Sequence, residues 1–239
     1  MRIWITRAEP EAQRTAQAVT AAGHRPLVSP LIQVAPLPSA SDRLAKALAG
    51  VAALAFTSAN GVRAFALLRP LSDRQHPVFA VGAATARAAR EAGFATVISA
   101  EGDVAALSRR IAAHKPPPAG AVLHCGALEP AGDLVGALEQ RGLGARFVAV
   151  YQTLPQAPTG ELLTALDQQP PGVGAVLIHS PKAAEALAAM LADRPALAGA
   201  LTVVCISKAA AEPLAAFKFA RRAVASKPNE AAMLARLTP

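Results

Sequence analysis

The chain has 239 residues, of which 53% are hydrophobic, 17% are charged and 4% are aromatic, and its formal net charge is +8. This length fits one large domain or two small ones. Because no run of about 18 apolar residues occurs and the N-terminus lacks the layout of a secretory signal, we expect neither a membrane span nor export. The basic residues are spread thinly without interleaved aromatic side chains, which argues against a nucleic-acid surface and fits either a small polyanionic ligand or a solvated surface.

Apolar runs typical of strands alternate with Ala-rich runs typical of helices along almost the whole chain, which predicts a parallel α/β architecture. The expected strands are 2–6, 25–29, 53–57, 78–81, 96–99, 121–124, 146–150, 175–179, 202–206 and 222–225. The expected helices include 9–22, 61–69, 83–92, 104–114, 133–140, 181–192, 209–217 and 229–237. The proline-rich segments 116–118 and 170–172 are expected to form exposed loops ahead of strands.

An internal repeat, spaced by about 120 residues, organises these elements. Residues 53–60 resemble 175–182, residues 78–82 resemble 203–207, and residues 96–99 resemble 222–226, each with a similar following helix. The first strand–helix–strand unit resembles the unit that begins at residue 121, so the two halves use their units in swapped order. We therefore predict two similar three-layer α/β domains with parallel, flavodoxin- or Rossmann-like sheets. Domain 1 is discontinuous (1–36 and 153–239), domain 2 is inserted (38–148), and hinge strands 30–37 and 149–155 pair as a two-stranded ladder.

In open parallel sheets, ligands bind beyond the carboxyl ends of the strands, where helix N-termini favour carboxylates and phosphates. Small or hydroxylic residues follow nearly every expected strand end, and they have two interpretations. They cap helices, or they line a cleft between two similar domains that binds a ligand with many carboxylates. The candidates are Thr6, Arg7, Ser58, Asn60, Gly82, Ala83, Thr85, Cys125, Gly126, Ser180 and Ser207.

Other chemistries lack their usual signatures. No glycine-rich dinucleotide or phosphate loop follows a strand, and the five histidines show no metal-ligand spacing, so we expect no cofactor and no metal. His124 and His179 end strands, and neither has an evident carboxylate partner in the sequence, which favours hydrogen-bonded structural roles. Cys125 and Cys205 lie in apolar runs and are expected to be buried, reduced thiols, which indicates a cytoplasmic location.

Tyr151 is the only tyrosine of the chain, and it lies on the second expected hinge strand. A phenol at this place could donate a proton or a hydrogen bond to a leaving hydroxyl. It could equally be a half-buried packing residue on the ladder. The residues themselves leave both interpretations open.

Several short motifs, taken in chain order, resemble uroporphyrinogen-III synthases. The stronger matches are 5–7, 22–32, 56–62, 81–86 and 150–153, and the weaker ones are 180–181 and 206–207. Each motif alone is weakly specific, whereas their order and the swapped repeat together are characteristic.

The resemblance implies a cofactor-free monomeric lyase that converts hydroxymethylbilane, which has four acetate and four propionate arms, to uroporphyrinogen III. Water leaves ring A, ring D attacks to give a spiro intermediate, and re-closure inverts ring D. Such a reaction depends on orientation and electrostatics more than on acid–base groups. The resemblance also implies that Tyr151 assists hydroxyl departure, that Ser58, Thr85 and Ser180 are polar contacts, and that backbone amides near Gly82 and Gly126 bind carboxylate arms.

The sequence departs from the family pattern at two places where the resemblance implies contacts with the substrate. Ala209 and Ala210 stand where some members have threonines, and Cys125 stands where many bacterial members have a basic residue. The alternatives are a non-catalytic two-domain binding protein or sensor for an anionic small molecule, and a nucleotide-dependent transferase, which the missing glycine-rich fingerprint disfavours.

Overall fold

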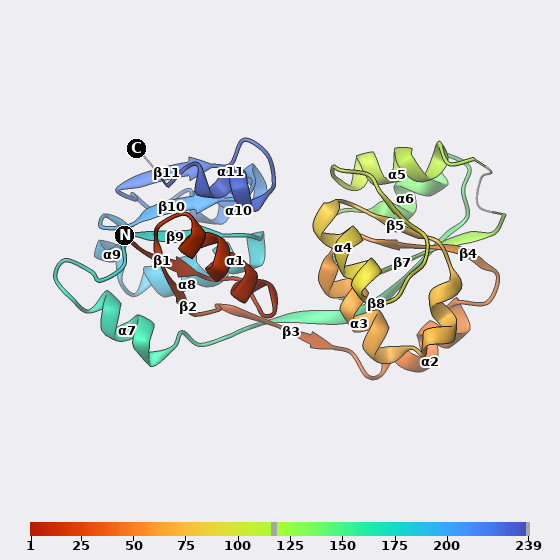
Figure 1. Cartoon of the computed structure of the whole chain (residues 1–239), viewed down its shortest axis with the longest axis horizontal. Coiled ribbons are helices and arrows are strands. Elements are labelled where there is room, and N and C mark those ends of the chain that lie inside the picture. Colours follow the sequence, from red (N-terminus) through yellow and green to blue (C-terminus); the bar gives the residue numbers. More distant parts are fainter. Residues whose placement is uncertain (116–118, 238–239) are drawn as a thin grey trace. The chain divides into compact units, whose positions relative to one another are not determined.

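The computed structural model describes residues 1–115 and 119–237, so the expected loop 116–118 lies outside the described residues. The chain divides into two compact units (Figure 1). Unit 1 comprises Met1–Gln33 and Leu154–Pro239, and unit 2 comprises Val34–Thr153. None of the described helices is long and apolar enough to cross a membrane.

Unit 1 contains a five-stranded sheet in the order β11-β10-β9-β1-β2, in which every neighbouring pair is parallel. If its strands are numbered within the unit, the order is 2-1-3-4-5, as in flavodoxin-like sheets. This confirms the expected α/β class. The strands are β1 (Arg2–Ile5), β2 (Arg25–Val28), β9 (Ala175–Ile178), β10 (Thr202–Cys205) and β11 (Arg221–Val224).

Helices cover both faces of this sheet because successive strand side chains point to opposite faces. On one face Trp4 and Val176 pack with buried residues of α7, α8, α9 and α10. On the other face Ile3 and Leu177 pack against α1 and α11. The helices are α1 (Glu11–Ala21), α7 (Gly160–Leu166), α8 (Pro181–Ala192), α9 (Pro195–Ala198), α10 (Lys208–Ala211) and α11 (Glu230–Leu234).

Unit 2 contains a six-stranded sheet in the order β3-β8-β7-β4-β5-β6. The five strands from β8 to β6 are mutually parallel, and they repeat the order of unit 1 when β7 and β8 are counted first. The swapped repeat expected from the sequence is therefore visible in the strand order. The strands are β3 (Ile32–Pro36), β4 (Val51–Phe56), β5 (Val78–Ala80), β6 (Val97–Ser99), β7 (Ala121–Ala127) and β8 (Ala145–Pro155).

The helices of unit 2 also form two layers. Phe56, Leu123 and Val150 face α2, α3 and α4, and Ala55, Phe79 and Val122 face α5 and α6. The helices are α2 (Ala40–Ala47), α3 (Ala59–Leu68), α4 (Ala83–Glu91), α5 (Val104–Ala112) and α6 (Leu134–Glu139), with a 3-10 turn η1 (Leu71–Gln75).

Strands β3 and β8 carry the chain from one unit to the other. The Leu37 amide donates to the Val150 carbonyl over 2.9 Å, and the Gln156 amide donates to the Leu31 carbonyl over 2.9 Å. Because residue numbers rise along one strand as they fall along its partner, the pair is antiparallel. Two expected segments, 146–150 and 149–155, form the single strand β8.

One expected helix differs in the structure. Instead of a helix over 209–217, the short helix α10 is followed by the 3-10 turn η2 (Glu212–Leu214). Pro213 explains the change because proline has no amide hydrogen and its ring disfavours a continuing α-helix. The residues that follow the ends of α1 and α4 are Gly23 (φ 78°) and Gly93 (φ 90°), which adopt the left-handed conformation that glycine allows.

Candidate functional site

In each unit the parallel strands end at one edge of the sheet, called here the carboxyl edge. Connections from adjacent strands diverge to opposite faces between β1 and β9 in unit 1, and between β7 and β4 in unit 2. Such points, where the strand order reverses, are the usual ligand-binding positions in open α/β sheets. Most of the predicted site residues follow strands that end at these two edges.

Tyr151 and Ser58 meet in unit 2. Tyr151 lies on β8 opposite Ala127 and is 7% exposed, and its hydroxyl hydrogen-bonds the Ser58 side chain. Burial raises the pKa of Tyr151, against a smaller opposing effect of the Ser58 hydrogen bond, so the phenol keeps its proton at neutral pH. Ser58 precedes α3 and accepts from the Asn60 amide over 3.1 Å. From the sequence, Ser58 could be only a helix cap and Tyr151 only a packing residue. In the structure their side chains contact each other.

The first turns of α3 and α4 add a side-chain amide and backbone amides. The Asn60 side chain is half-buried and accepts from Arg63 over 3.2 Å. Gly82 precedes the nine-residue helix α4, and no side chain caps this helix. The amides of its first turn, with exposed Ala83, therefore match the geometry that binds anions at helix N-termini. Thr85 is only 4% exposed, so its side chain is largely inside the unit.

The predicted strand end at Cys125 and Gly126 is wrong, because β7 continues to Ala127 and Gly126 is paired with Ala149. Cys125 is fully buried among apolar side chains, and burial raises the pKa of its thiol, so this side chain cannot contact a ligand. Packing explains the glycine at position 126, because a Cβ atom there would lie 3.0 Å from both the His124 and Phe147 rings. The expected free thiols are confirmed, since both Cys125 and Cys205 are buried and unbridged.

His124 occupies the point of unit 2 where the strand order reverses. Its Nε2 atom lies 3.1 Å from the Thr57 hydroxyl, and its ring centroid lies 5.2 Å from that of Phe147. Burial lowers the pKa of His124 to about 4, with nearby Asp133 acting in the opposite direction, so the imidazole is neutral at pH 7. Both rings and Asp133 line a pocket of about 490 Å³.

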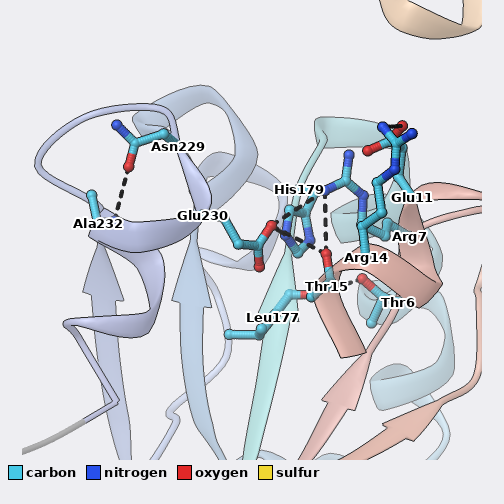
Figure 2. Close-up of polar contacts among 10 residues, drawn as sticks. All are labelled: Thr6, Arg7, Glu11, Arg14, Thr15, Leu177, His179, Asn229, Glu230 and Ala232. Atoms are coloured by element: carbon cyan, nitrogen blue, oxygen red, sulfur yellow. Dashed lines mark hydrogen bonds and ion pairs between the residues drawn. The ribbon is translucent and has the colours of Figure 1, made fainter. Parts of the chain in front are cut away.

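The carboxyl edge of unit 1 carries a charged network instead (Figure 2). Arg7 Nη1 lies 3.3 Å from Thr15 Oγ1 and 3.4 Å from Glu230 Oε2. Thr15 donates to the same carboxylate oxygen over 3.1 Å, and His179 Nε2 lies 3.2 Å from it. Thr6, by contrast, is fully buried and donates to the Leu177 carbonyl over 2.7 Å. Its hydroxyl therefore ties β1 to β9 and does not face a ligand.

The protonation states in this network follow from its geometry. Burial lowers the pKa of His179, against the opposing effect of its hydrogen bond to Glu230, so the imidazole is neutral at pH 7. Burial alone would raise the pKa of Glu230, but His179, Arg7 and Thr15 together hold it below its usual value. The sequence shows no evident carboxylate partner for His179, but the structure supplies one in Glu230. Glu230 lies 51 residues further along the chain, and its only sequence signal was its place at the start of the expected last helix.

Two further candidates in unit 1 are helix caps. Ser180 accepts from the Ala183 amide and Ser207 accepts from the Ala210 amide, each over 3.2 Å, and both serines are half-buried. Of the two alanines after Ser207 that stand where some family members have threonines, Ala209 is exposed and Ala210 is buried. Among residues 1–115 and 119–237, no group of three or more His, Cys, Asp or Glu side chains could hold a metal ion.

A pocket of unit 1, of about 570 Å³, lies away from these residues. It is lined by loops that precede β9 and β10, so it opens at the opposite, amino edge of the sheet. The ion pair between Arg194 and Asp167 (2.7 Å) lines it. The predicted site residues of unit 1 lie at the carboxyl edge, and none of them lines this pocket.

Comparison with known proteins gives three findings. The family model for uroporphyrinogen-III synthase HemD matches residues 13–235, which is most of the chain. No curated protein sequence matches significantly. Among solved structures, a mutant uroporphyrinogen III synthase from the extremely thermophilic bacterium Thermus thermophilus is 21% identical, with a TM-score of 0.59 and 99% and 97% of the two chains covered. Uroporphyrinogen-III synthetase from Helicobacter pylori is 18% identical, with the same TM-score and coverage. At these identities the structural likeness supports the fold.

Proposed function

Because this chain belongs to the uroporphyrinogen-III synthase family of tetrapyrrole biosynthesis, we propose that it is a lyase that closes hydroxymethylbilane to uroporphyrinogen III. The family match over residues 13–235 is the observation that carries this proposal. Water is lost from ring A, and ring D is inverted through a spiro intermediate. The chain acts as a monomer in this proposal, which size-exclusion chromatography with light scattering can test.

Tyr151 is the proposed proton donor to the leaving hydroxyl. The O–H bond of the phenol breaks as the C–O bond of the hydroxymethyl group breaks, and water leaves with the proton. The cationic ring A carbon is then attacked by ring D, and the proton released when the macrocycle regains its pyrrole rings returns to the phenolate. A buried phenol that is protonated at neutral pH and oriented by Ser58 supports this role.

The carboxylate arms of the substrate are the proposed ligands of several half-buried or exposed groups. The uncapped first turn of α4, at Gly82 and Ala83, offers backbone amides. Arg7 offers a guanidinium whose side chain is 25% exposed. Asn60, Ser180 and Ser207 complete the proposed polar contacts. These groups hold and orient a flexible chain, which is the main demand of the reaction.

The decisive test couples porphobilinogen and its deaminase to this protein and separates the oxidised type I and type III isomers. Uncatalysed closure gives type I, so we expect type III to predominate when the protein is added. An isomer ratio that the protein leaves unchanged would reject the enzyme and favour a non-catalytic binding protein or sensor.

The role of Tyr151 is tested by Tyr151→Phe. We expect turnover to fall about tenfold without being abolished, because orientation supplies much of the acceleration. Thermal unfolding of the variant checks that the fold is kept. Turnover at the wild-type rate would show that the phenol does not assist hydroxyl departure.

A further inference from the structure

The network around Glu230 concentrates three contacts on one carboxylate oxygen. Arg7, Thr15 and His179 all contact Oε2 within 3.4 Å. Among the described residues, Oε1 of Glu230 and Nδ1 of His179 are both buried and have no hydrogen-bond partner. Unpaired buried polar atoms cost free energy. A pair built only for stability would not be expected to leave two such atoms, so a functional reason is called for.

The two histidine nitrogens have defined roles if the imidazole is neutral. Nε2 then carries the hydrogen that it donates to Glu230, and Nδ1 carries the lone pair. His179 therefore orients the carboxylate without adding a positive charge that would compete with Arg7. Its side chain is only 4% exposed, whereas the side chain of Arg7 is 25% exposed. The buried part of the network lies behind the accessible guanidinium.

The fold does not require charged or ionisable residues at the positions of Arg7 and His179, because unit 2 has neither at the equivalent positions. In unit 1 Ile5 is paired with Leu177, and Arg7 and His179 each stand two residues further along. In unit 2 the corresponding register pairs His124 with Ala55, and two residues further along stand Gly126 and Thr57. The same strand order is thus built with uncharged residues at the equivalent positions.

We propose that Glu230 and His179 are positioning residues that fix the Arg7 guanidinium for one carboxylate arm of the substrate. The inference rests on the proposed function. Glu230 and Thr15 hold Nη1, His179 holds Glu230, and the partly exposed guanidinium meets the arm at the point where the strand order of unit 1 reverses. A bidentate carboxylate contact depends on the orientation of the guanidinium plane, so losing this support weakens binding more than it slows the chemical step.

The test compares KM and kcat for Glu230→Gln, Glu230→Asp, Arg7→Gln and the double variant Arg7→Gln/Glu230→Gln. We expect Glu230→Gln to raise KM about tenfold with kcat nearly unchanged, and Glu230→Asp to raise it less. In the Arg7→Gln background the second substitution should have no further effect on KM, since Glu230 acts through Arg7. His179→Leu should raise KM, and His179→Gln, which keeps a donor near Nε2, should restore it.

Asp167→Asn is the matched control, because it breaks the Arg194 ion pair at the amino edge of the same unit and should leave KM unchanged. Titration with uroporphyrin III, which has eight carboxylates, gives a readout independent of turnover, and its Kd should rise about tenfold in Glu230→Gln. An unchanged or lower KM and Kd in Glu230→Gln, or additive effects in the double variant, would overturn the inference. Failure of the wild-type isomer assay with a Kd that still depends on Glu230 would reject the proposed function alone.

Discussion

The carboxyl edges of the two units carry different polar side chains. In unit 1 the strands at the reversal point lead into Arg7 and His179, which join Glu230 in a charged network. In unit 2 the equivalent positions are Gly126 and Thr57, and the local histidine, His124, contacts the neutral Thr57 hydroxyl. Unit 2 instead presents the Tyr151 phenol and the uncapped start of α4.

The contrast supports the division of tasks that is proposed above for the two units. The sheet order and the helix layers are shared because both units must bury apolar strands on two faces. The edge residues are not constrained by that packing, so one edge can hold a fixed cation for a carboxylate and the other a neutral proton donor. Three measurements test whether the two units differ in this way.

The strongest change that we expect is a loss of stability of unit 2 at acidic pH. The pKa of His124 is lowered from 6.5 to about 4 by burial. The unfolded chain takes up a proton near pH 6.5 and the folded chain only near pH 4, so stability is present above pH 6.5 and is lost as pH falls. At about 1.4 kcal/mol per pH unit, this loss is about 3 kcal/mol. His124→Gln should remove that part of the pH dependence.

The two units can be followed separately in this experiment. Trp4 is the only tryptophan and is buried in unit 1, and Tyr151 is the only tyrosine and lies in unit 2. Urea unfolding between about pH 7.5 and about pH 4, on either side of the ordinary histidine pKa, is monitored by tryptophan fluorescence and by near-ultraviolet tyrosine signals. The His124→Gln effect should appear in the tyrosine transition. A tyrosine transition that keeps the wild-type pH dependence would contradict the neutral, buried state of His124.

The second prediction concerns how closely α3 packs against β7 in unit 2. A Cβ atom on Gly61 of α3 would lie 2.8 Å from the Cys125 carbonyl oxygen, a backbone atom that cannot easily move. The equivalent residue of unit 1, three positions after the capping serine, is the buried Ala183. We expect Gly61→Ala to destabilise unit 2 by about 2 kcal/mol through overcrowding.

Ala183→Gly provides the matched control in unit 1. It should cost about 1 kcal/mol, because glycine loses more conformational entropy in a helix than alanine. The tyrosine transition reports the first variant and the tryptophan transition reports the second. If Gly61→Ala leaves the tyrosine transition in place, the close approach of α3 to β7 is not a constraint.

Much of the scaffold could be predicted from the sequence because local patterns determine it. Apolar runs of four or five residues mark the strands, and a helix predicted over 181–192 has those bounds in the structure. Local pattern could not show that β7 continues through Cys125, since pairing with β8 extends it. The break after α10, by contrast, could have been anticipated, because Pro213 lies inside the predicted helix 209–217.

The candidate site was predicted in part for a similar reason. Arg7, Ser58 and Tyr151 lie in motifs that follow or join strands, so their positions could be inferred from chain order. Their partners depend on tertiary contacts: Arg7 meets Glu230 across 223 residues, and Tyr151 meets Ser58 from a different strand. Hydroxyls such as that of Thr6 cannot be assigned to ligand or backbone before the neighbouring strand is known.

A weaker change separates helix capping from a functional role at two equivalent serines. Ser58 and Ser180 each cap the helix that follows the corresponding strand of its unit, and each accepts one backbone amide. Ser58→Ala and Ser180→Ala should therefore cost about 1 kcal/mol of stability each. Ser58 also contacts Tyr151, so Ser58→Ala alone should lower turnover beyond what the lost cap explains, by a few-fold. Thermal unfolding and steady-state rates of both variants measure the two effects. If the two variants have equal turnover and equal loss of stability, Ser58 acts only as a helix cap and does not orient the Tyr151 phenol.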